Sequence, residues 1–305
     1  MAPRRYIAQT PLSQFHRDPV ISMDFDPTGR YLVSIDAGHQ LEPGNQDSEF
    51  SAYLVVWNVA ATSPLRHEYA LEMKFGLSQV LWLDFGLVVA GRDGTLTVIT
   101  QDEGTHRLNV VSFLAHPSLI QRMAFSKTTN LLLTASVDGL VLWNTPVHGV
   151  GLKRRTEMQH ACSVAPGKRH APFTVTGLYW LSDSQFIVAY MDHHFVIWDI
   201  EQSTRVREIS CRGQEARVDA AFYGSTAAVS FAKGLIELYD VEKNFFAGEH
   251  EHDGLGASPC LLVHSGTALV HGTEDGKVVL RNAEKIKVSS APNSGIVVLE
   301  PRGEI

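Results

Sequence analysis

The chain repeats one short motif along almost its whole length. Each copy is an apolar segment whose fourth residue is followed by Asn or Asp in the clearest cases. The copies are Leu54–Asn58, Leu96–Thr100, Leu140–Asn144, Phe195–Asp199, Ile236–Asp240 and Val278–Asn282. Their fourth residues lie at positions 57, 99, 143, 198, 239 and 281, so the spacings are 42, 44, 55, 41 and 42. A period near 42 residues restricts the chain to a repeat architecture in which every unit has one supersecondary structure.

Tight turns precede these segments at regular places. Asp-Gly pairs stand before three of them, at Asp93-Gly94, Asp138-Gly139 and Asp275-Gly276. Asp-Gly between two apolar runs is a strong hairpin signal, because the turn needs backbone conformations that these residues tolerate. Further short apolar runs precede each turn, as at 121–125 and 131–135. Helical periodicity is nearly absent, so each unit is predicted to consist of short antiparallel strands.

Consecutive apolar positions, as at 131–133, suit sheets that are covered on both faces. Units of about 40–45 residues with such strands predict an all-β fold, a β-propeller of four-stranded antiparallel blades. The single domain is expected to cover 1–305. Six repeats are recognisable, at about 20–75, 79–115, 120–172, 175–212, 216–252 and 259–290.

The bulk composition narrows the class of protein. The formal net charge is −7, which provides no general footprint for nucleic acid or for an anionic membrane. Three cysteines without a Cys-x-x-Cys pair argue against a disulfide framework and favour a reducing compartment. The N-terminus has no apolar core of a signal peptide, and the apolar stretch near 80–90 is too short to span a membrane. We expect a location in the cytoplasm or the nucleus.

The third repeat carries a distinctive set of polar residues. His116 lies nine residues before Phe125, and Ser136, Asp138 and Trp143 follow in the next two strands. With these residues the chain resembles the WD-repeat family, in which a His, a Ser or Thr, an Asp and a Trp are linked by hydrogen bonds within a blade. The resemblance implies such a structural network here, since buried polar groups must satisfy one another.

The other repeats match this pattern only in part. The first has His16 and Trp57 without a clear turn Asp, and the fourth has Tyr190 where Ser or Thr is expected. The retained members are His16, Trp57, Asp192, Trp198, Tyr239, Asp240 and Asp275, with Thr273 also in place and Arg281 instead of Trp. In propellers that this chain resembles, an N-terminal strand closes the ring, a role that falls to residues 3–12. Residues 295–305 are interpreted as the start of a seventh blade. The sequence favours a seven-bladed design with an incomplete last blade, the alternative being a ring of six.

Ser136, His116 and Asp138 could be mistaken for a catalytic set. No Gly-x-Ser-x-Gly turn exists to expose a serine nucleophile, so the structural interpretation is favoured. No catalytic residue, cofactor site or metal site is predicted. The run from Glu249 to Asp253 contains metal-capable side chains, but it is expected to be an incidental polar segment.

Two insertions are candidate partner surfaces. Residues 146–174 hold five basic side chains against the single acid Glu157, namely Lys153, Arg154, Arg155, Lys168 and Arg169. Arginines there could bind carboxylates or phosphates of a partner. Residues 37–52 form the second insertion.

The favoured function is a non-catalytic scaffold that mediates protein–protein interaction and complex assembly as a subunit of a hetero-complex. No membrane partner is expected, and the charge argues against nucleic acid. One alternative is a propeller-fold enzyme, a hydrolase or lyase, with turn carboxylates converging at a channel mouth. Another is a nucleic-acid-associated subunit that binds through 146–174.

Overall fold

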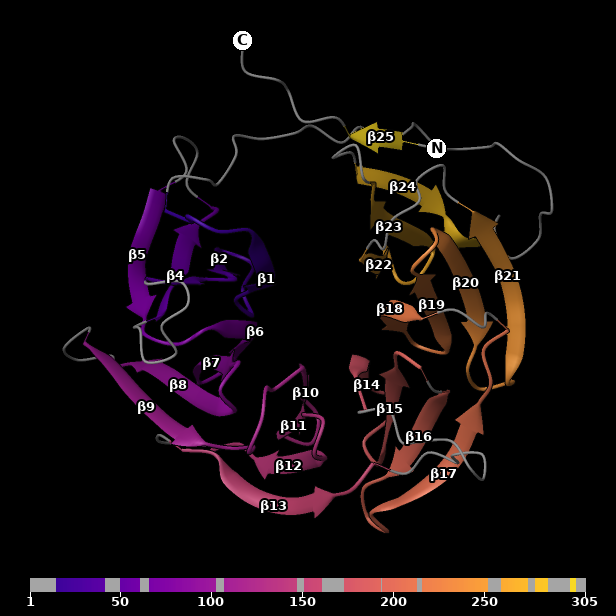
Figure 1. Cartoon of the computed structure of the whole chain (residues 1–305), viewed down its shortest axis with the longest axis horizontal. Helices are drawn as coiled ribbons and strands as arrows, with labels where there is room; N and C mark the ends of the chain where they lie inside the picture. The colour runs from indigo at the N-terminus through magenta and orange to yellow at the C-terminus, as the bar shows by residue number, and fades with distance from the viewer. Residues whose placement is uncertain are drawn as a thin grey trace. The chain divides into compact units, whose positions relative to one another are not determined.

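The structure is a computed structural model that describes residues 15–41, 50–60, 66–102, 107–146, 151–160, 173–192, 194–212, 216–251, 259–273, 278–284 and 297–299. The chain divides into two compact units, Thr10–His160 and Met1–Gln9 with Ala161–Ile305. Each unit contains three antiparallel sheets, which we call blades and number along the chain (Figure 1). The all-β prediction and the six four-stranded antiparallel blades of a propeller are confirmed.

Blades one to three make up the unit Thr10–His160. Blade one contains β1 (Val20–Phe25), β2 (Tyr31–Asp36), β4 (Phe50–Asn58) and β5 (Arg66–Met73), with the short β3 (His39–Gln40) beside β4. Blade two contains β6 (Leu77–Leu83), β7 (Gly86–Gly91), β8 (Thr95–Gln101) and β9 (Leu108–Leu114). Blade three contains β10 (Arg122–Ser126), β11 (Leu131–Ala135), β12 (Leu140–Asn144) and β13 (Lys153–Met158).

Blades four to six belong to the second unit. Blade four contains β14 (Val175–Trp180), β15 (Gln185–Tyr190), β16 (Phe195–Asp199) and β17 (Thr204–Ile209). Blade five contains β18 (Arg217–Tyr223), β19 (Thr226–Phe231), β20 (Leu235–Asp240) and β21 (Phe245–Glu251). Blade six contains β22 (Cys260–Val263), β23 (Ala268–Gly272), β24 (Val278–Asn282) and β25 (Val297–Leu299).

The core of each unit lies between consecutive blades. Val33 and Leu54 of blade one pack with Val80 and Leu87 of blade two in one cluster. Similar clusters join blades two and three, four and five, and five and six. The middle strands are therefore buried on both faces, which explains why they are apolar at consecutive positions. Removal of this apolar surface from water is the main driving force for stacking one blade on the next.

Polar side chains of the first strand in a blade set the register against the next blade. Gln79 of β6 donates to the Met123 carbonyl at 3.2 Å and accepts the Met123 N–H at 2.6 Å. Asp24 of β1 accepts the Trp82 N–H at 2.7 Å, and Asp219 of β18 accepts the Cys260 N–H at 2.9 Å. These bonds satisfy backbone groups of β10, β6 and β22, the first strands of the neighbouring sheets, at the edge where the strand-to-strand hydrogen bonds of the sheet end.

The predicted start of a seventh blade is wrong for its described part. Residues 297–299 form β25, which pairs antiparallel with β24 as the fourth strand of blade six. Without this pairing the outer edge of β24 would expose its backbone groups. An apolar run after the sixth repeat looks the same in the sequence whether it begins a new blade or completes the last one. The ring-closing strand predicted at 3–12 lies outside the described residues.

Both insertions contain strands. Lys153–Met158 of the insertion 146–174 is β13, the outer strand of blade three, paired with β12. Within 37–52, β3 pairs with the first two residues of β4 and extends that hairpin beyond the blade. Among the residues described, no helix is long and apolar enough to cross a membrane.

Candidate functional site

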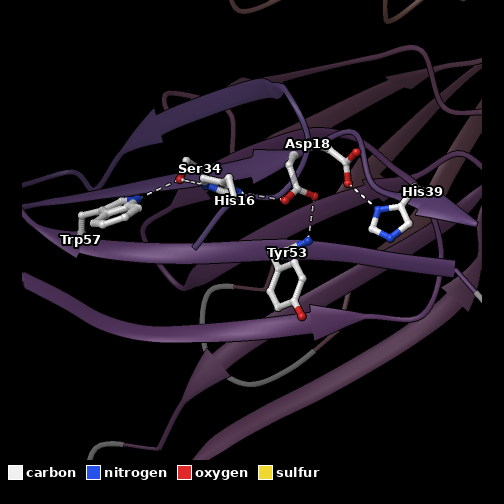
Figure 2. Close-up of polar contacts among 7 residues, drawn as sticks. His16, Asp18, Ser34, His39, Tyr53 and Trp57 are labelled. Atoms are coloured by element: carbon white, nitrogen blue, oxygen red, sulfur yellow. Dashed lines mark hydrogen bonds and ion pairs between the residues drawn. The ribbon is translucent and has the colours of Figure 1, made fainter. Parts of the chain in front are cut away.

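A chain of hydrogen-bonded side chains crosses blade one (Figure 2). Trp57 Nε1 donates to Ser34 Oγ at 2.8 Å, and His16 Nε2 lies 2.6 Å from the same hydroxyl. On the other side of the ring, His16 Nδ1 lies 3.1 Å from Asp36 Oδ2. The second Asp36 oxygen accepts the Tyr53 N–H at 2.8 Å. The four-residue blade network that the family resemblance implies is therefore complete in blade one.

The direction of these bonds follows from the inventory of donors. With the proton on His16 Nδ1, the ring donates to Asp36 and accepts the Ser34 hydroxyl proton, and Ser34 in turn accepts the indole N–H. Each buried donor then has an acceptor. This matters because Ser34 is 3% exposed and Asp36 is 0% exposed, so a missing partner would leave a buried polar group unsatisfied.

The sequence did not identify two members of this network. His16 and Trp57 were predicted, but Ser34 and Asp36 were not. Asp36 is followed by the β3–β4 extension, not by a tight Asp-Gly turn, so the turn signal is missing. The strand register supplies the missing relation, because Trp57 pairs with Leu32 and Ser34 lies two residues farther along the same face of β2.

In blade three the hydroxyl of the network belongs to Thr134. His116 Nε2 lies 2.7 Å from Thr134 Oγ1, and Trp143 Nε1 donates to that oxygen at 3.0 Å. The assignment of Ser136 to this place is wrong. Ser136 stands just beyond β11, and its hydroxyl accepts the Asp138 N–H at 3.1 Å. Trp143 pairs with Leu132, so the same-face neighbour two residues on is Thr134.

Asp138 also lies elsewhere than the resemblance implies. Its side chain is exposed, and its carboxylate accepts a hydrogen bond from Ser118 Oγ, whereas His116 is buried. The carboxylate acts on the His116 ring through its charge alone, which favours protonation. Burial is the largest effect on His116 and lowers its pKa to about 4, helped by the positive charges of Arg154 and His160.

The register that places Ser34 and Thr134 identifies the matching position in every blade. It is the residue two after the one paired with the repeat marker, namely Ser34, Val89, Thr134, Val188, Val229 and His271. In blade four the place expected for Ser or Thr is thus filled by Val188, not by Tyr190. Accordingly the indole Nε1 of Trp198 is buried and has no hydrogen-bond partner among the residues that the structure describes.

The remaining predicted network residues have other environments. Tyr239 OH bonds to Glu237 in the same strand and accepts the Arg212 N–H at 2.8 Å. Asp240 Oδ1 accepts the Lys243 N–H at 3.0 Å and so closes the turn to β21. Asp192 is exposed at the end of blade four's second hairpin. Asp275 lies outside the described residues.

Ser34, His16 and Asp36 are linked by hydrogen bonds in the same sequence as the members of a catalytic Ser–His–Asp triad. Their surroundings differ from those of a triad. A catalytic serine must reach its substrate, with donors placed for the developing oxyanion. Here Ser34 is buried and its oxygen already accepts the Trp57 indole N–H. The arrangement uses the polar groups to hold strands β2 and β4 and the segment before β1 together.

The predicted basic contacts divide into three groups. Lys153 and Arg155 are exposed on β13. Arg154 is exposed as well, but it also contacts its own unit: it lies 5.7 Å over the Trp143 ring, donates to the Ala115 carbonyl at 3.1 Å and pairs with Glu157 at 3.2 Å. Lys168 and Arg169 lie outside the described residues. The structure thus leaves two described cations of this set available to a partner.

Metal-capable residues do not gather in the part of the chain that the structure describes. No group of three His, Cys, Asp or Glu side chains there could hold a metal ion. Of the polar run at 249–253, the described part ends at Glu251, and the His250 ring lies 6.3 Å from that of His271.

A matched pair of substitutions tests the blade network. Thr134→Val removes the acceptor of the Trp143 indole and the partner of His116, so it should destabilise the fold by about 2 kcal/mol. Val188→Thr gives the unpaired Trp198 indole an acceptor and should stabilise the fold by up to about 1 kcal/mol. The midpoint of chemical unfolding measures both. Changes of the same sign in the two variants would contradict the assignment.

The buried His116 should make stability depend on pH. Its pKa falls from 6.5 in the unfolded chain to about 4 in the fold, so the unfolded chain binds more protons between these values. The free energy of unfolding should therefore fall as the pH drops from about 6.5 to 4, by about 3 kcal/mol on account of this group. His116→Gln should lose this part of the pH dependence. The free energies of unfolding of the wild type and the variant at pH 7 and at pH 4 measure the difference. An equal acid sensitivity of the two proteins would refute the assignment.

Comparison with known proteins gives two informative similarities. The chain is 24% identical over 250 residues to the SIR4-interacting protein SIF2 of Saccharomyces cerevisiae, a match that covers 75% of this chain and 40% of that protein. It is 23% identical over 255 residues to the ribosome biogenesis protein WDR12 homolog of Trichoplax adhaerens, covering 74% of this chain and 57% of that protein. The chain thus corresponds to less than two thirds of the length of each relative. No protein-family model matches the sequence.

These similarities extend over three quarters of the chain. The structure adds two observations, the blades and the network of blade one. Six four-stranded blades, and the His–Ser–Asp–Trp network of blade one, are the features on which the family resemblance depends. The two similarities and the six blades are consistent with a divergent member of the WD-repeat β-propeller family.

Proposed function

We propose that the chain is a non-catalytic scaffold that binds other proteins as a subunit of an intracellular hetero-complex, in the cytoplasm or the nucleus. The observation that carries the proposal is the enclosure of its Ser–His–Asp set. Ser34 and Asp36 are buried and bonded within the blade, so they stabilise the frame and offer no reacting atom to a substrate. A rigid frame with exposed strands and turns suits recognition of macromolecules.

The names of the two relatives support the same class of function. One is named for its interaction with SIR4, and the other for ribosome biogenesis. Both names describe work in association with other macromolecules. Because fold alone does not determine function, this support comes from similarity, and the partner of this chain has to be identified by experiment.

The exposed cations of β13 are the proposed contact surface. Lys153 and Arg155 lie two residues apart on β13, where the pairing with β12 is irregular, and both side chains are exposed. An arginine guanidinium can bind a carboxylate or phosphate with two parallel hydrogen bonds, and a neighbouring lysine adds charge. A partner with an acidic surface fits this pair.

A capture experiment with point variants tests the contact surface. Replacement of all of 146–174 would remove β13 and damage blade three, so Lys153→Gln with Arg155→Gln is the better change. The control is Lys127→Gln with Lys243→Gln, which makes the same change in net charge at two exposed lysines elsewhere. We expect affinity-tagged wild type and control to retain the same specific partners by quantitative mass spectrometry, and the β13 variant to lose about tenfold or more of one of them.

Equal recovery with the β13 variant and the control would reject the basic strand as the contact. Partners that disappear after nuclease digestion would instead favour the nucleic-acid-associated alternative.

Labelling with a fluorophosphonate probe tests whether Ser34 acts as the nucleophile of a serine hydrolase. Because Ser34 is enclosed, the folded chain should label no more than its Ser34→Ala variant, while a serine hydrolase in the same assay labels fully. Detection by mass spectrometry of the label on Ser34 of the folded protein would overturn the scaffold proposal.

A further inference from the structure

The outer strand of blade two, unlike those of blades one, three, four and five, carries no charged residue. Four outer strands carry two or more charged residues each, namely β5 (Arg66–Met73), β13 (Lys153–Met158), β17 (Thr204–Ile209) and β21 (Phe245–Glu251). β9 reads Leu-Asn-Val-Val-Ser-Phe-Leu over 108–114 and has none. Charged side chains on an edge strand are a common device against pairing with another chain. β9 is seven residues long and lacks this protection.

Three apolar side chains of β9 are also exposed. Val110 is 50% exposed, Val111 is 38% exposed and Leu114 is 70% exposed. One edge of β9 pairs with β8 along the whole strand, and the other is the outer edge of the sheet (Figure 1). Within the described part of the chain, no strand pairs with that outer edge. Its backbone N–H and C=O groups face outward beside apolar side chains.

β9 is nevertheless held firmly in its blade. Ser112 Oγ lies 2.8 Å from Thr97 Oγ1 of β8, and the Phe113 ring packs against that of Trp143 with 5.5 Å between centroids. The strand is therefore ordered before any partner arrives, so the loss of conformational freedom on pairing is small.

We propose that β9 pairs antiparallel with β9 of a second copy of this chain, about a two-fold axis at Val111. In this register Leu108 lies opposite Leu114 of the other copy, and Val111 lies opposite Val111 of the other copy. Apolar and β-branched cross-strand pairs stabilise antiparallel sheets, and no charged residue is brought into the contact. Leucine opposite leucine and valine opposite valine are what favour a second copy over an unrelated segment, while Asn109 lies opposite Phe113 and Val110 opposite Ser112. Such an interface is isologous, as in most homodimers.

The charge of the chain predicts how salt affects this dimer. Each copy carries a net charge of −7, so two copies repel one another at long range. Salt screens that repulsion, while backbone hydrogen bonds and apolar contacts remain. Dimerisation should therefore become stronger from low to moderate ionic strength, whereas a contact made by ion pairs would become weaker.

Sedimentation velocity of the full 305-residue chain over a range of concentrations tests the proposal. We expect a monomer–dimer equilibrium in the wild type that strengthens with salt. Val111→Lys places like charges opposite one another at the axis and should weaken the dimer about tenfold or more. The matched control is Val206→Lys, because Val206 is 53% exposed on the charged outer strand β17 and should change the dissociation constant less than about twofold.

Hydrogen exchange of the wild type gives a readout that needs no variant. Amides of 109–113 should exchange more slowly at concentrations where the dimer forms, and those of β17 should not change. A chain that stays monomeric at all accessible concentrations overturns the proposal. So does a dimer that Val111→Lys leaves intact, or one whose protection falls outside β9.

Discussion

The structure depends on the stacking of sheets that are apolar on both faces. A single blade such as β10–β13 could not be stable alone, because Leu131, Leu132 and Leu133 would expose one face or the other. Stacking on blades one and three buries both faces of blade two, as the clusters between these blades show. The repeat in the sequence is the direct consequence of this constraint, since every blade must present the same pair of apolar faces.

Polar groups inside such a stack reduce stability unless they satisfy one another. Blade one meets this condition with four side chains, and blade three meets it around Thr134 with the neutral His116. Blade four shows the opposite case, because Val188 replaces the hydroxyl and leaves the Trp198 indole N–H without an acceptor. The apolar packing around Trp198 still holds the blade together. The networks therefore refine individual blades, and the fold tolerates their loss one at a time.

The fold could be predicted from the sequence because strand period, turn residues and repeat spacing all report on the same unit. The site was harder to predict, because it depends on register. Whether Thr134 or Ser136 faces Trp143 is decided by the residue with which Trp143 pairs, and a shift of one residue reverses the face. Asp36 was missed because its hairpin is extended by β3, which hides the turn signal. β25 was assigned to a new blade because an apolar run carries no information about which strand it will join.

The Ser34–His16–Asp36 set shows why residue types and distances alone do not define an active site. Its bonds match those of a hydrolytic triad, but the hydroxyl is occupied by an indole N–H and closed off from water. The same chemistry that would activate a serine at a surface here satisfies buried atoms of three chain segments. Solvent exposure decides which groups can act on another molecule. The buried polar groups stabilise the blades, while the exposed, uncharged edge of β9 is open to another strand. The surface features to which function can be assigned are therefore the outer strands, where the blades differ most from one another.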